Sequence, residues 1–362
     1  MNKYIIPREI SDKLLMVGLY YKDNAPGGMA SVIQYYEQYF ESMNYYATWH
    51  LVSPIRRAWM FCKAYICILF RLLFDRKIEL VHIHTAADGS FWRKSKIAWL
   101  CKKMGKKVIL HMHASRFKDF YKESNKKDWI LKNLKNVDRL IVLSESWKEW
   151  FISIGLEADK IEVLHNITAY PKPMPEAKVA DNKVHYLFLG EIGPRKGVFD
   201  MLKGVATHKE EMNDRVEIRI GGNKNETQLK TFIKDNGLDN IVKFEGFVSG
   251  ENKLRLLNWA DVFILPSHNE GLPIAILEAM SYGCVIISTP VGGIPEVVFP
   301  SVNGILVPPG NIEEISSAMM CYVNDCTLIE KEGKESLKIV ETYLPNYVLT
   351  HLKRLYEEMM KK

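Results

Sequence analysis

The chain has 362 residues and a net charge of +6, with 47% hydrophobic and 25% charged residues. This composition excludes an intrinsically disordered chain, and the length favours two domains over a single core. The longest apolar run covers residues 64–70, too few to span a bilayer, and the N-terminal residues lack the pattern of a signal peptide. We therefore expect a cytoplasmic protein whose six scattered cysteines are reduced core thiols and not metal ligands.

Short apolar runs alternate with amphipathic segments through residues 1–168. A first strand is predicted over residues 13–19, and a helix over 29–43 follows a loop that ends in Gly27 and Gly28. Further strands are predicted over residues 80–84, 107–113 and 139–143. This alternation indicates a parallel sheet covered by helices, and we interpret these residues as an N-terminal Rossmann-like domain.

Most of the positive charge lies in this first half. Residues 1–168 contain 27 Lys and Arg against 17 Asp and Glu, and two aromatic, basic, amphipathic stretches cover residues 55–74 and 91–107. Each stretch suits a helix that lies in an anionic membrane interface. The alternative is that its apolar side belongs to the core and its cations are solvated. Nucleic acid is not expected as a partner, because no nucleic-acid-binding motif accompanies the charge.

Residues 169–183 contain three prolines and few large apolar side chains, which is typical of a linker between domains. A second series of strands is predicted over residues 184–190, 216–221, 242–247, 262–266, 285–288 and 304–307. We interpret residues 184–340 as a C-terminal Rossmann-like domain and residues 341–362 as a helix that packs back on the N-terminal domain. Two doubly wound α/β domains in series predict a cleft, which the carboxyl ends of the strands face.

The segment over residues 263–283 predicts a strand, a loop and then a helix near Pro273, since proline is well tolerated at the first helical position. The free N–H groups at this helix start would form an anion site. They belong to Ile274, Ala275 and Ile276. We therefore expect the phosphates of a nucleotide to bind here, with Gly271 and Leu272 of the preceding loop as further donor-binding residues.

Glu270 and Glu278 lie on either side of this helix start. Carboxylates are good bidentate acceptors for sugar hydroxyls. The pattern suits a nucleoside-diphosphate sugar whose ribose binds Glu278 and whose transferred sugar binds Glu270. The alternative is an amphipathic helix with two incidental surface glutamates, although Glu278 stands between apolar Leu277 and Ala279.

A glycine-rich loop with two adjacent cations, Arg195 and Lys196, follows the strand predicted over residues 184–190. A diphosphate leaving group gains negative charge as the glycosidic bond breaks, and fixed cations stabilise that charge without a metal. We interpret both cations as phosphate-binding residues, with a solvated turn as the alternative.

Residues 185–310 resemble the nucleotide-binding half of the large retaining glycosyltransferase family 4, which has the GT-B fold. Glu270 and Glu278 match the E-x7-E pattern of this family, and Arg195-Lys196 matches its cationic loop. One position departs from the family pattern. Glu191 stands where the family usually has an arginine, a charge that Arg195 could supply.

The first half resembles the family more weakly. Gly27-Gly28 is similar to its glycine loop, and His113 matches its histidine at the end of a strand, where it could contact the sugar or shape the acceptor pocket. A metal site made of the two histidine pairs, His82/His84 and His111/His113, is conceivable. Structural or acceptor-side roles are favoured for these pairs.

The resemblance implies a metal-independent hexosyltransferase that retains the anomeric configuration. Its substrates would be a nucleoside-diphosphate sugar, with UDP favoured over GDP, and a glycan or polyprenyl-diphosphate-linked glycan in capsule, exopolysaccharide or O-antigen synthesis. The candidate catalytic residues are then Glu270, His113 and Lys196. Phe247 and Val248, after a strand end, are candidate contacts for the base. The sequence contains no D-x-D motif, so we expect no metal and no cofactor.

The basic stretches and the resemblance together favour an anionic membrane surface as a partner and a peripheral location on the cytosolic face of the inner membrane. Two other functions fit the same fold. A GT-B-like sugar-nucleotide epimerase would turn over the donor with no acceptor present. A non-catalytic GT-B partner subunit would keep the fold without the activity, an alternative that Glu191 strengthens.

Overall fold

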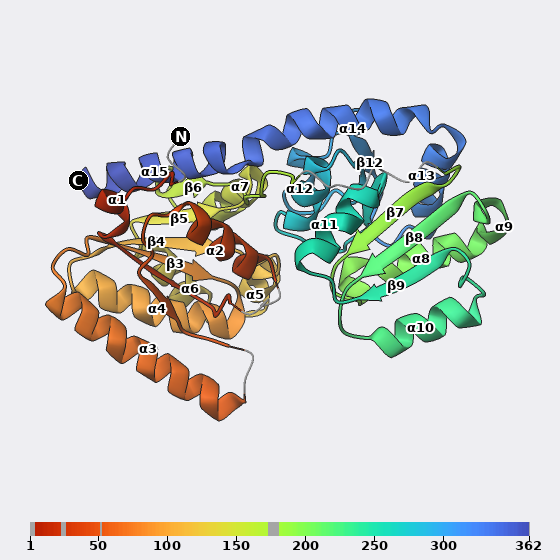
Figure 1. The fold of residues 1–362 in the computed structure, drawn as a ribbon. Coiled ribbons are helices and arrows are strands. Elements are labelled where there is room, and N and C mark those ends of the chain that lie inside the picture. The colour runs from red at the N-terminus through yellow and green to blue at the C-terminus, as the bar shows by residue number, and fades with distance from the viewer. Residues whose placement is uncertain (1–3, 23–26, 51–52, 173–180, 362) are drawn as a thin grey trace. The chain divides into compact units, whose positions relative to one another are not determined.

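The computed structural model describes residues 4–22, 27–50, 53–172 and 181–361 (Figure 1). The chain divides into two compact units. Unit 1 consists of Met1–Ile167 and Pro345–Lys362, and unit 2 of Thr168–Leu344. Each unit has a six-stranded parallel sheet, which confirms the predicted α/β class with two Rossmann-like sheets. None of the described helices is long and apolar enough to cross a membrane.

The sheet of unit 1 has the strand order β2-β1-β3-β4-β5-β6. Its strands are β1 (Leu14–Gly18), β2 (Tyr45–Ala47), β3 (Leu80–Thr85), β4 (Lys107–Met112), β5 (Arg139–Val142) and β6 (Ile161–Val163). Its helices are α1 (Arg8–Ser11), α2 (Gly28–Tyr39), α3 (Pro54–Phe74), α4 (Asp88–Lys103), α5 (Phe117–Glu123), α6 (Lys127–Lys135), α7 (Glu145–Ser153) and α15 (Pro345–Lys361). The direction of winding reverses between β1 and β3, where sheets of this kind bind ligands at the carboxyl ends of their strands.

Two features of unit 1 differ from the sequence-based expectation. The strands β2 and β6, each of three residues at an edge of the sheet, were not predicted. The helix α2 ends at Tyr39, before the predicted end at Met43. The next residue, Phe40, is extended, with ψ of 132°. Its side chain is buried, and its backbone forms an isolated parallel β-bridge with Ile6.

The core of unit 1 combines strand residues with aromatic side chains from α4 to α7. The ring of Phe117 lies 5.3 Å from that of Phe91 and 5.6 Å from that of Phe151, measured between centroids. The C-terminal helix α15 belongs to the same unit and packs against β3. Its Tyr356 is fully buried, and the phenol oxygen lies 2.6 Å from His82 Nδ1.

All six cysteines are free, but the expectation that they are core thiols is wrong for most of them. Only Cys101 and Cys284 are buried among the six. Cys62 is exposed on α3, and Cys321 and Cys326 are exposed at and after the end of α13 (Ile312–Asn324). The pattern of apolar neighbours in the sequence does not distinguish the outer face of these helices from the inner one.

The sheet of unit 2 has the strand order β12-β11-β10-β7-β8-β9. Its strands are β7 (Val184–Leu189), β8 (Val216–Gly221), β9 (Val242–Gly246), β10 (Val262–Leu265), β11 (Val285–Ser288) and β12 (Gly304–Leu306). Besides α13, its helices are α8 (Val198–Thr207), α9 (Lys209–Met212), α10 (Glu226–Asp235), α11 (Gly250–Trp259), α12 (Ile274–Ser281) and α14 (Thr327–Val340). All these strands lie within one residue of the predicted ranges. β7, β10 and β11 are buried along their whole length, whereas apolar residues alternate with charged ones in β8 and β9.

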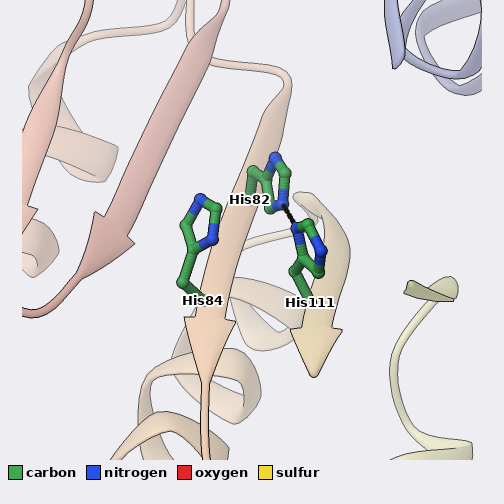
Figure 2. A group of neighbouring side chains, drawn as sticks. All are labelled: His82, His84 and His111. Atoms are coloured by element: carbon green, nitrogen blue, oxygen red, sulfur yellow. Dashed lines mark hydrogen bonds between the residues drawn. The ribbon is translucent and has the colours of Figure 1, made fainter. Parts of the chain in front are cut away.

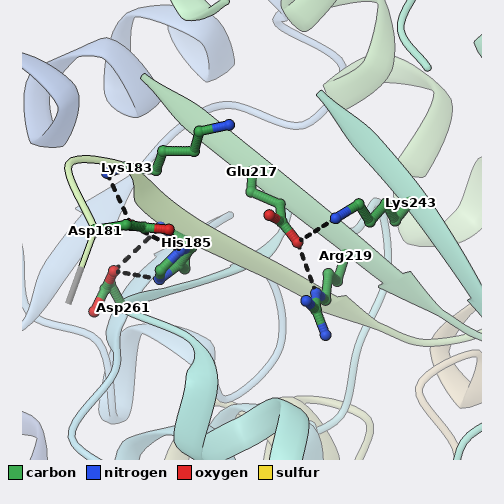
Figure 3. A network of polar contacts seen from close by, with 7 residues as sticks. All are labelled: Asp181, Lys183, His185, Glu217, Arg219, Lys243 and Asp261. Atoms are coloured by element: carbon green, nitrogen blue, oxygen red, sulfur yellow. Dashed lines mark hydrogen bonds and ion pairs between the residues drawn. The ribbon is translucent and has the colours of Figure 1, made fainter. Parts of the chain in front are cut away.

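A polar network lies towards the amino ends of the strands in unit 2 (Figure 3). His185, the second residue of β7, contacts Asp181 through Nε2 at 3.3 Å and Asp261 through Nδ1 at 3.4 Å. On β8 and β9, Glu217 accepts hydrogen bonds from Arg219 at 2.9 Å and from Lys243 at 3.1 Å. These contacts lie away from the carboxyl edge of the sheet, so we assign them to stability.

Candidate active site

Three loops of unit 2 meet where the strand order of its sheet reverses. β7, the first strand of the unit, pairs with β8 on one side and with β10 on the other. Open α/β sheets bind ligands at the carboxyl ends of their strands at such a reversal. The loop after β7 contains Arg195 and Lys196, the loop after β10 contains Glu270, and the loop after β11 contains Gly292. The structure thus brings the main predicted donor residues to one edge of one sheet.

Lys196 and Glu270 form an ion pair at this edge. Lys196 Nζ lies 2.5 Å from Glu270 Oε1, and Ser267 Oγ donates a hydrogen bond to the same oxygen at 2.8 Å. Glu270 is only 8% exposed. Burial of a carboxylate costs free energy, which the lysine and the hydroxyl offset. The pair places a cation and a hydrogen-bond acceptor side by side.

Two glycines allow the loops around this pair to approach each other through their backbones. Gly197 has φ of +72°, and a Cβ atom there would lie 2.0 Å from the carbonyl oxygen of Pro266. Gly292 has φ of +58°, and a Cβ atom there would lie 2.1 Å from the carbonyl oxygen of Glu270. Only glycine fits both requirements. The position of Glu270 therefore depends on the loop after β11 as well as on its own.

Glu278 lies on α12 and forms the second ion pair of the site. It is 8% exposed, and its Oε1 accepts a hydrogen bond from Lys253 Nζ at 2.7 Å. Sequence analysis missed Lys253, because no motif links it to a glutamate 25 residues further along the chain. One feature of the sequence could have pointed to Lys253: it lies in the first turn of α11, the helix that follows the Phe247-Val248 loop.

Arg195 has weaker contacts than Lys196. Its Nη1 donates to the carbonyl oxygen of Asn269 at 3.3 Å and lies 3.9 Å from Glu270 Oε1. Glu191, which replaces the expected arginine, lies 3.9 Å from Arg195 Nη2 and 3.0 Å from Lys224 Nζ through the same oxygen. Glu191 therefore lies between two cations and partly neutralises the positive charge of this loop.

The start of α12 differs from the prediction in two details. Pro273 is the N-cap residue and α12 begins at Ile274, one residue later than a proline at the first helical position would give. The Ile276 N–H donates to the Pro273 carbonyl oxygen at 3.2 Å, so the prediction of a free N–H at Ile276 is wrong. Leu272 and Ile274 have buried side chains, so a ligand would have to meet their backbone groups.

The candidate base contacts lie on the same edge of the sheet, after β9. Phe247 is half exposed, whereas Val248 packs over the end of β8. A Cβ atom on Gly221 would lie 2.6 Å from Val248 Cγ2, which shows how closely that side chain covers the strand end. β8 separates these two residues from the reversal at β7 and β10.

The remaining predicted residues belong to unit 1. Gly27 and Gly28 lie at the start of α2, which follows β1, and Gly27 has φ of +110°. His113 follows β4, and its backbone N–H donates to the Thr85 carbonyl oxygen at 2.9 Å. Its Nε2 lies 2.9 Å from His84 Nδ1, at the end of β3. The glycines and the histidine pair thus lie near the reversal of the unit 1 sheet, between β1 and β3.

Four histidines form one buried stack: His82 and His84 on β3, His111 on β4 and His113 directly after β4. Figure 2 shows the first three. His82 Nε2 lies 3.2 Å from His111 Nδ1. Ring nitrogens of His82, His84 and His111 all lie within 4.8 Å of one another, so these described residues could hold a metal ion. Burial lowers the pKa of His113 to about 3, and burial together with the neighbouring His113 lowers the pKa of His82 to about 3. The stack is therefore made of neutral imidazoles.

Comparison with known proteins covers both halves of the chain. Residues 172–336 match the family model "Glycosyl transferases group 1", and residues 35–168 match "Glycosyltransferase Family 4". The amylovoran biosynthesis glycosyltransferase AmsK of Erwinia amylovora is 28% identical over 255 residues, which are 68% of this chain and 61% of AmsK. A 2-deoxystreptamine N-acetyl-D-glucosaminyltransferase of Niallia circulans is 25% identical over 298 residues, 77% of this chain and 76% of that protein.

Solved structures share the fold at low sequence identity. Sucrose-phosphate synthase from Thermosynechococcus elongatus superposes with a TM-score of 0.77 and 16% identity, covering 98% of this chain and 99% of that one. Anabaena HepE in complex with UDP and glucose gives 0.73 and 17%, covering 96% and 99%. The chain therefore has the GT-B fold of glycosyltransferases. The two family models together match most of its length, and with these relatives they identify it as a glycosyltransferase of the family 4 type. The chain spans about 61% of AmsK and about half of MJ1607 of Methanocaldococcus jannaschii, the first relatives it matches.

Proposed function

We propose that this protein transfers a hexose-type sugar from a nucleoside-diphosphate sugar to a glycan or a polyprenyl-diphosphate-linked glycan, with retention of the anomeric configuration. The observation that carries the proposal is the pair Lys196–Glu270 at the reversal of the unit 2 sheet, with Arg195 beside it and Glu278–Lys253 on the neighbouring helices. Cations and carboxylates in this order along one sheet edge fit a ligand that has phosphates between two sugar rings.

In this proposal each group has one duty. Lys196 and Arg195 neutralise the diphosphate as it leaves, which replaces the metal ion of other glycosyltransferases. Glu278 accepts the ribose hydroxyls, and Glu270 orients the transferred sugar. His113 contacts the sugar or the acceptor, and the departing phosphate takes the proton of the incoming hydroxyl. Phe247 and Val248 meet the base, and backbone groups of Gly27, Gly28, Gly271, Leu272 and Ile274 complete the donor site.

Names of similar proteins support a role in polysaccharide synthesis. AmsK is named for amylovoran synthesis, and a similar protein of Escherichia coli, WcaL, is named for colanic acid. The HepE structures contain UDP or UDP-glucose, which supports a UDP-sugar as donor over a GDP-sugar. We accordingly propose a surface polysaccharide as the product, and an anionic membrane surface as the place where a lipid-linked acceptor is met.

The deciding experiment is a thermal-shift panel of UDP-, GDP- and ADP-sugars in the presence of a chelator, followed by transfer assays with the donor that stabilises the protein. We expect a UDP-sugar to raise the melting temperature and to be consumed rapidly only when an acceptor is present. Conversion of the donor without any acceptor would indicate the epimerase. A protein that no nucleotide stabilises would be the non-catalytic subunit, and activity that is lost in chelator would contradict metal independence.

A further inference from the structure

An apolar stripe runs along the outer side of α3. Its members follow one another at intervals of three or four residues and are all exposed: Ile55, Trp59, Cys62, Ile66, Phe70 and Leu73. At 3.6 residues per turn, these positions fall within about 80° of the helix circumference. Six of the fifteen large apolar side chains that are exposed in the described part of the chain lie on this one helix, with Ile55 and Phe74 at least 80% exposed.

The stripe lies opposite the face through which α3 packs. Ala64, Ile68 and Leu72 are buried, and α3 contacts α4 and β2. These three positions fall on the other side of the helix from the stripe, about half a turn away. The core of unit 1 therefore does not account for the stripe, and contiguous apolar patches of this kind mark interaction sites.

The charges of α3 identify the partner. The helix has four Lys and Arg residues and no Asp or Glu. Arg56 and Lys63 lie along one side of the stripe, and Lys63 Nζ lies 5.2 Å from the centre of the Trp59 ring. Tryptophan and lysine on one side of an amphipathic helix occupy the headgroup region of a bilayer, where the cations meet anionic lipids.

We propose that α3 lies in the plane of an anionic membrane, with this stripe among the acyl chains and with Arg56 and Lys63 at the headgroups. The second basic stretch has a different role. Phe91 and Ile97 of α4 are buried in the core of unit 1, so α4 supports α3. The exposed residues in the last half of α4 are Lys96, Trp99 and Lys103. The inference deepens the proposed function by naming its membrane surface, and it involves no donor-site residue.

The first test is cosedimentation of the full-length protein with vesicles of phosphatidylcholine and with vesicles in which part of that lipid is replaced by phosphatidylglycerol. We expect strong binding to the anionic vesicles only, and a loss of that binding in high salt, where exposed charges are screened within a few ångströms. A protein that stays in the supernatant with anionic vesicles at low salt would overturn the proposal.

Substitutions separate the apolar from the charged contribution. Trp59→Ser with Phe70→Ser should weaken binding to anionic vesicles by about tenfold or more, because two large side chains no longer leave water. The matched control, Phe299→Ser with Tyr347→Ser, removes two exposed rings outside the stripe and should bind as the wild type does. Equal losses for the two double variants would contradict the stripe as the docking surface.

The electrostatic contribution is tested with Arg56→Gln and Lys63→Gln together. We expect this variant to lose the preference for anionic over neutral vesicles, because about 1 kcal/mol per cation, a factor of about five each, is removed. An unchanged preference would count against Arg56 and Lys63 as the headgroup contacts.

A fluorescent probe can report insertion directly. Cys62 lies in the middle of the stripe, so a solvent-sensitive label on a variant with Cys67→Ser, Cys321→Ser and Cys326→Ser should shift to the blue with anionic vesicles. The matched control retains Cys321 on α13 and replaces the other three; its label should not shift. A shift at Cys321 and none at Cys62 would place the membrane contact elsewhere.

Two further measurements keep the outcomes apart. Light scattering without lipid tests whether the stripe joins two copies of the chain; a dimer that the Trp59→Ser, Phe70→Ser variant dissociates, without change in vesicle binding, would overturn the proposal. Donor binding is measured on the same samples. Vesicle binding without donor binding would refute the proposed function and leave this inference standing, and the reverse result would do the opposite.

Discussion

Two lysine–glutamate pairs divide the charge at the carboxyl edge of the unit 2 sheet. Lys196–Glu270 joins residues 74 positions apart, and Lys253–Glu278 joins residues 25 positions apart. Each carboxylate is nearly buried and each lysine is more exposed than its partner. In the proposed function, a donor that approaches from solvent would meet the cations first, and each carboxylate would become available to hydroxyl groups once phosphate has drawn its lysine away.

The two glutamates should differ in their effect on catalysis. We expect Glu278→Gln to raise the donor Kd by at least about tenfold, since a hydrogen bond to a charged acceptor contributes about 1.5–3 kcal/mol. Glu270→Gln should lower kcat by about 100-fold with a smaller change in Kd, because the proposed function places Glu270 next to the reacting sugar. Calorimetry with the donor and single-turnover kinetics measure the two quantities.

Lys253→Gln and Glu330→Gln serve as comparisons for these variants. Lys253→Gln removes the ion pair with Glu278 but leaves the carboxylate in place. It should therefore raise the donor Kd less than Glu278→Gln does. Glu330 forms an exposed pair with Lys334, and its loss should change neither Kd nor kcat. A Glu278→Gln variant with wild-type donor affinity would refute the assignment of the ribose to this residue.

Gly292 should be a sensitive position because of the backbone that it faces. Gly292→Ala is expected to destabilise the protein by more than about 2 kcal/mol and to weaken donor binding, since its Cβ would meet the Glu270 and Gly271 carbonyl oxygens. Gly105→Ala is the matched control: its φ is +71°, but nothing lies within 4 Å of the added atom. It should cost about 1–2 kcal/mol, the left-handed conformation alone. Urea unfolding gives both values, and equal losses would show that the close approach does not matter.

At the scale of elements, the sequence predicted the repeated alternation of apolar strands and amphipathic helices. Most strands of both sheets were located from their apolar residues, which are continuous in β1 and β10 and alternate with charged residues in β8 and β9, whereas β2 and β6 were missed. Glu270 and Lys196 were both named, but their contact was not, since it depends on β7 and β10 being neighbours. The Ile276 N–H was wrongly taken as free because the tight first turn before it cannot be read from residue types.

The contact of His185 with Asp261 at the start of β7 should make its largest contribution to the stability of unit 2 at mildly acidic pH. Burial alone would lower the pKa of His185, but its contacts with Asp261 and then Asp181 hold that pKa above its usual value of 6.5. The charged contact therefore stabilises the fold fully below pH 6.5, and this contribution disappears as pH rises through the higher, folded-state pKa. We expect His185→Gln to cost about 1 kcal/mol or more at pH 6 and less at pH 9.

Urea unfolding of the wild type and of His185→Gln at the two pH values measures this difference. His268→Gln is the matched control, because His268 is exposed and contacts a single carboxylate, Asp200. A His185→Gln penalty that grows with rising pH would show that the histidine is neutral in the folded protein.

The molecule as a whole should lose unit 1 first in acid. The folded pKa values of His82 and His113 lie at about 3, below the usual 6.5, so the unfolded chain binds more protons than the folded one between these values. Stability therefore falls with falling pH by about 1.4 kcal/mol per pH unit for each such histidine. Seven of the eight tryptophans lie in residues 1–167, so tryptophan fluorescence mainly reports this unit.

We expect an acid titration to change tryptophan fluorescence before far-UV circular dichroism has lost the signal of unit 2. His82→Gln should reduce the slope of unfolding free energy against pH by the contribution of one histidine. His268→Gln should leave this slope unchanged. Simultaneous loss of both signals, with no effect of His82→Gln, would mean that the histidine stack does not determine acid stability.

The placement of α15 in unit 1 has a consequence for the order in which the protein can form on the ribosome. Residues 168–344 are contiguous, so unit 2 has all its parts before the last helix is made. Unit 1 is translated first. Its strand β3 and its His82 can make their contacts with α15 and Tyr356 only after the last residues of the chain are synthesised. Domains usually complete in the order of their synthesis. Here the second unit has all its residues first, and a chain that ends before α15 has a complete unit 2 and a unit 1 without its last helix.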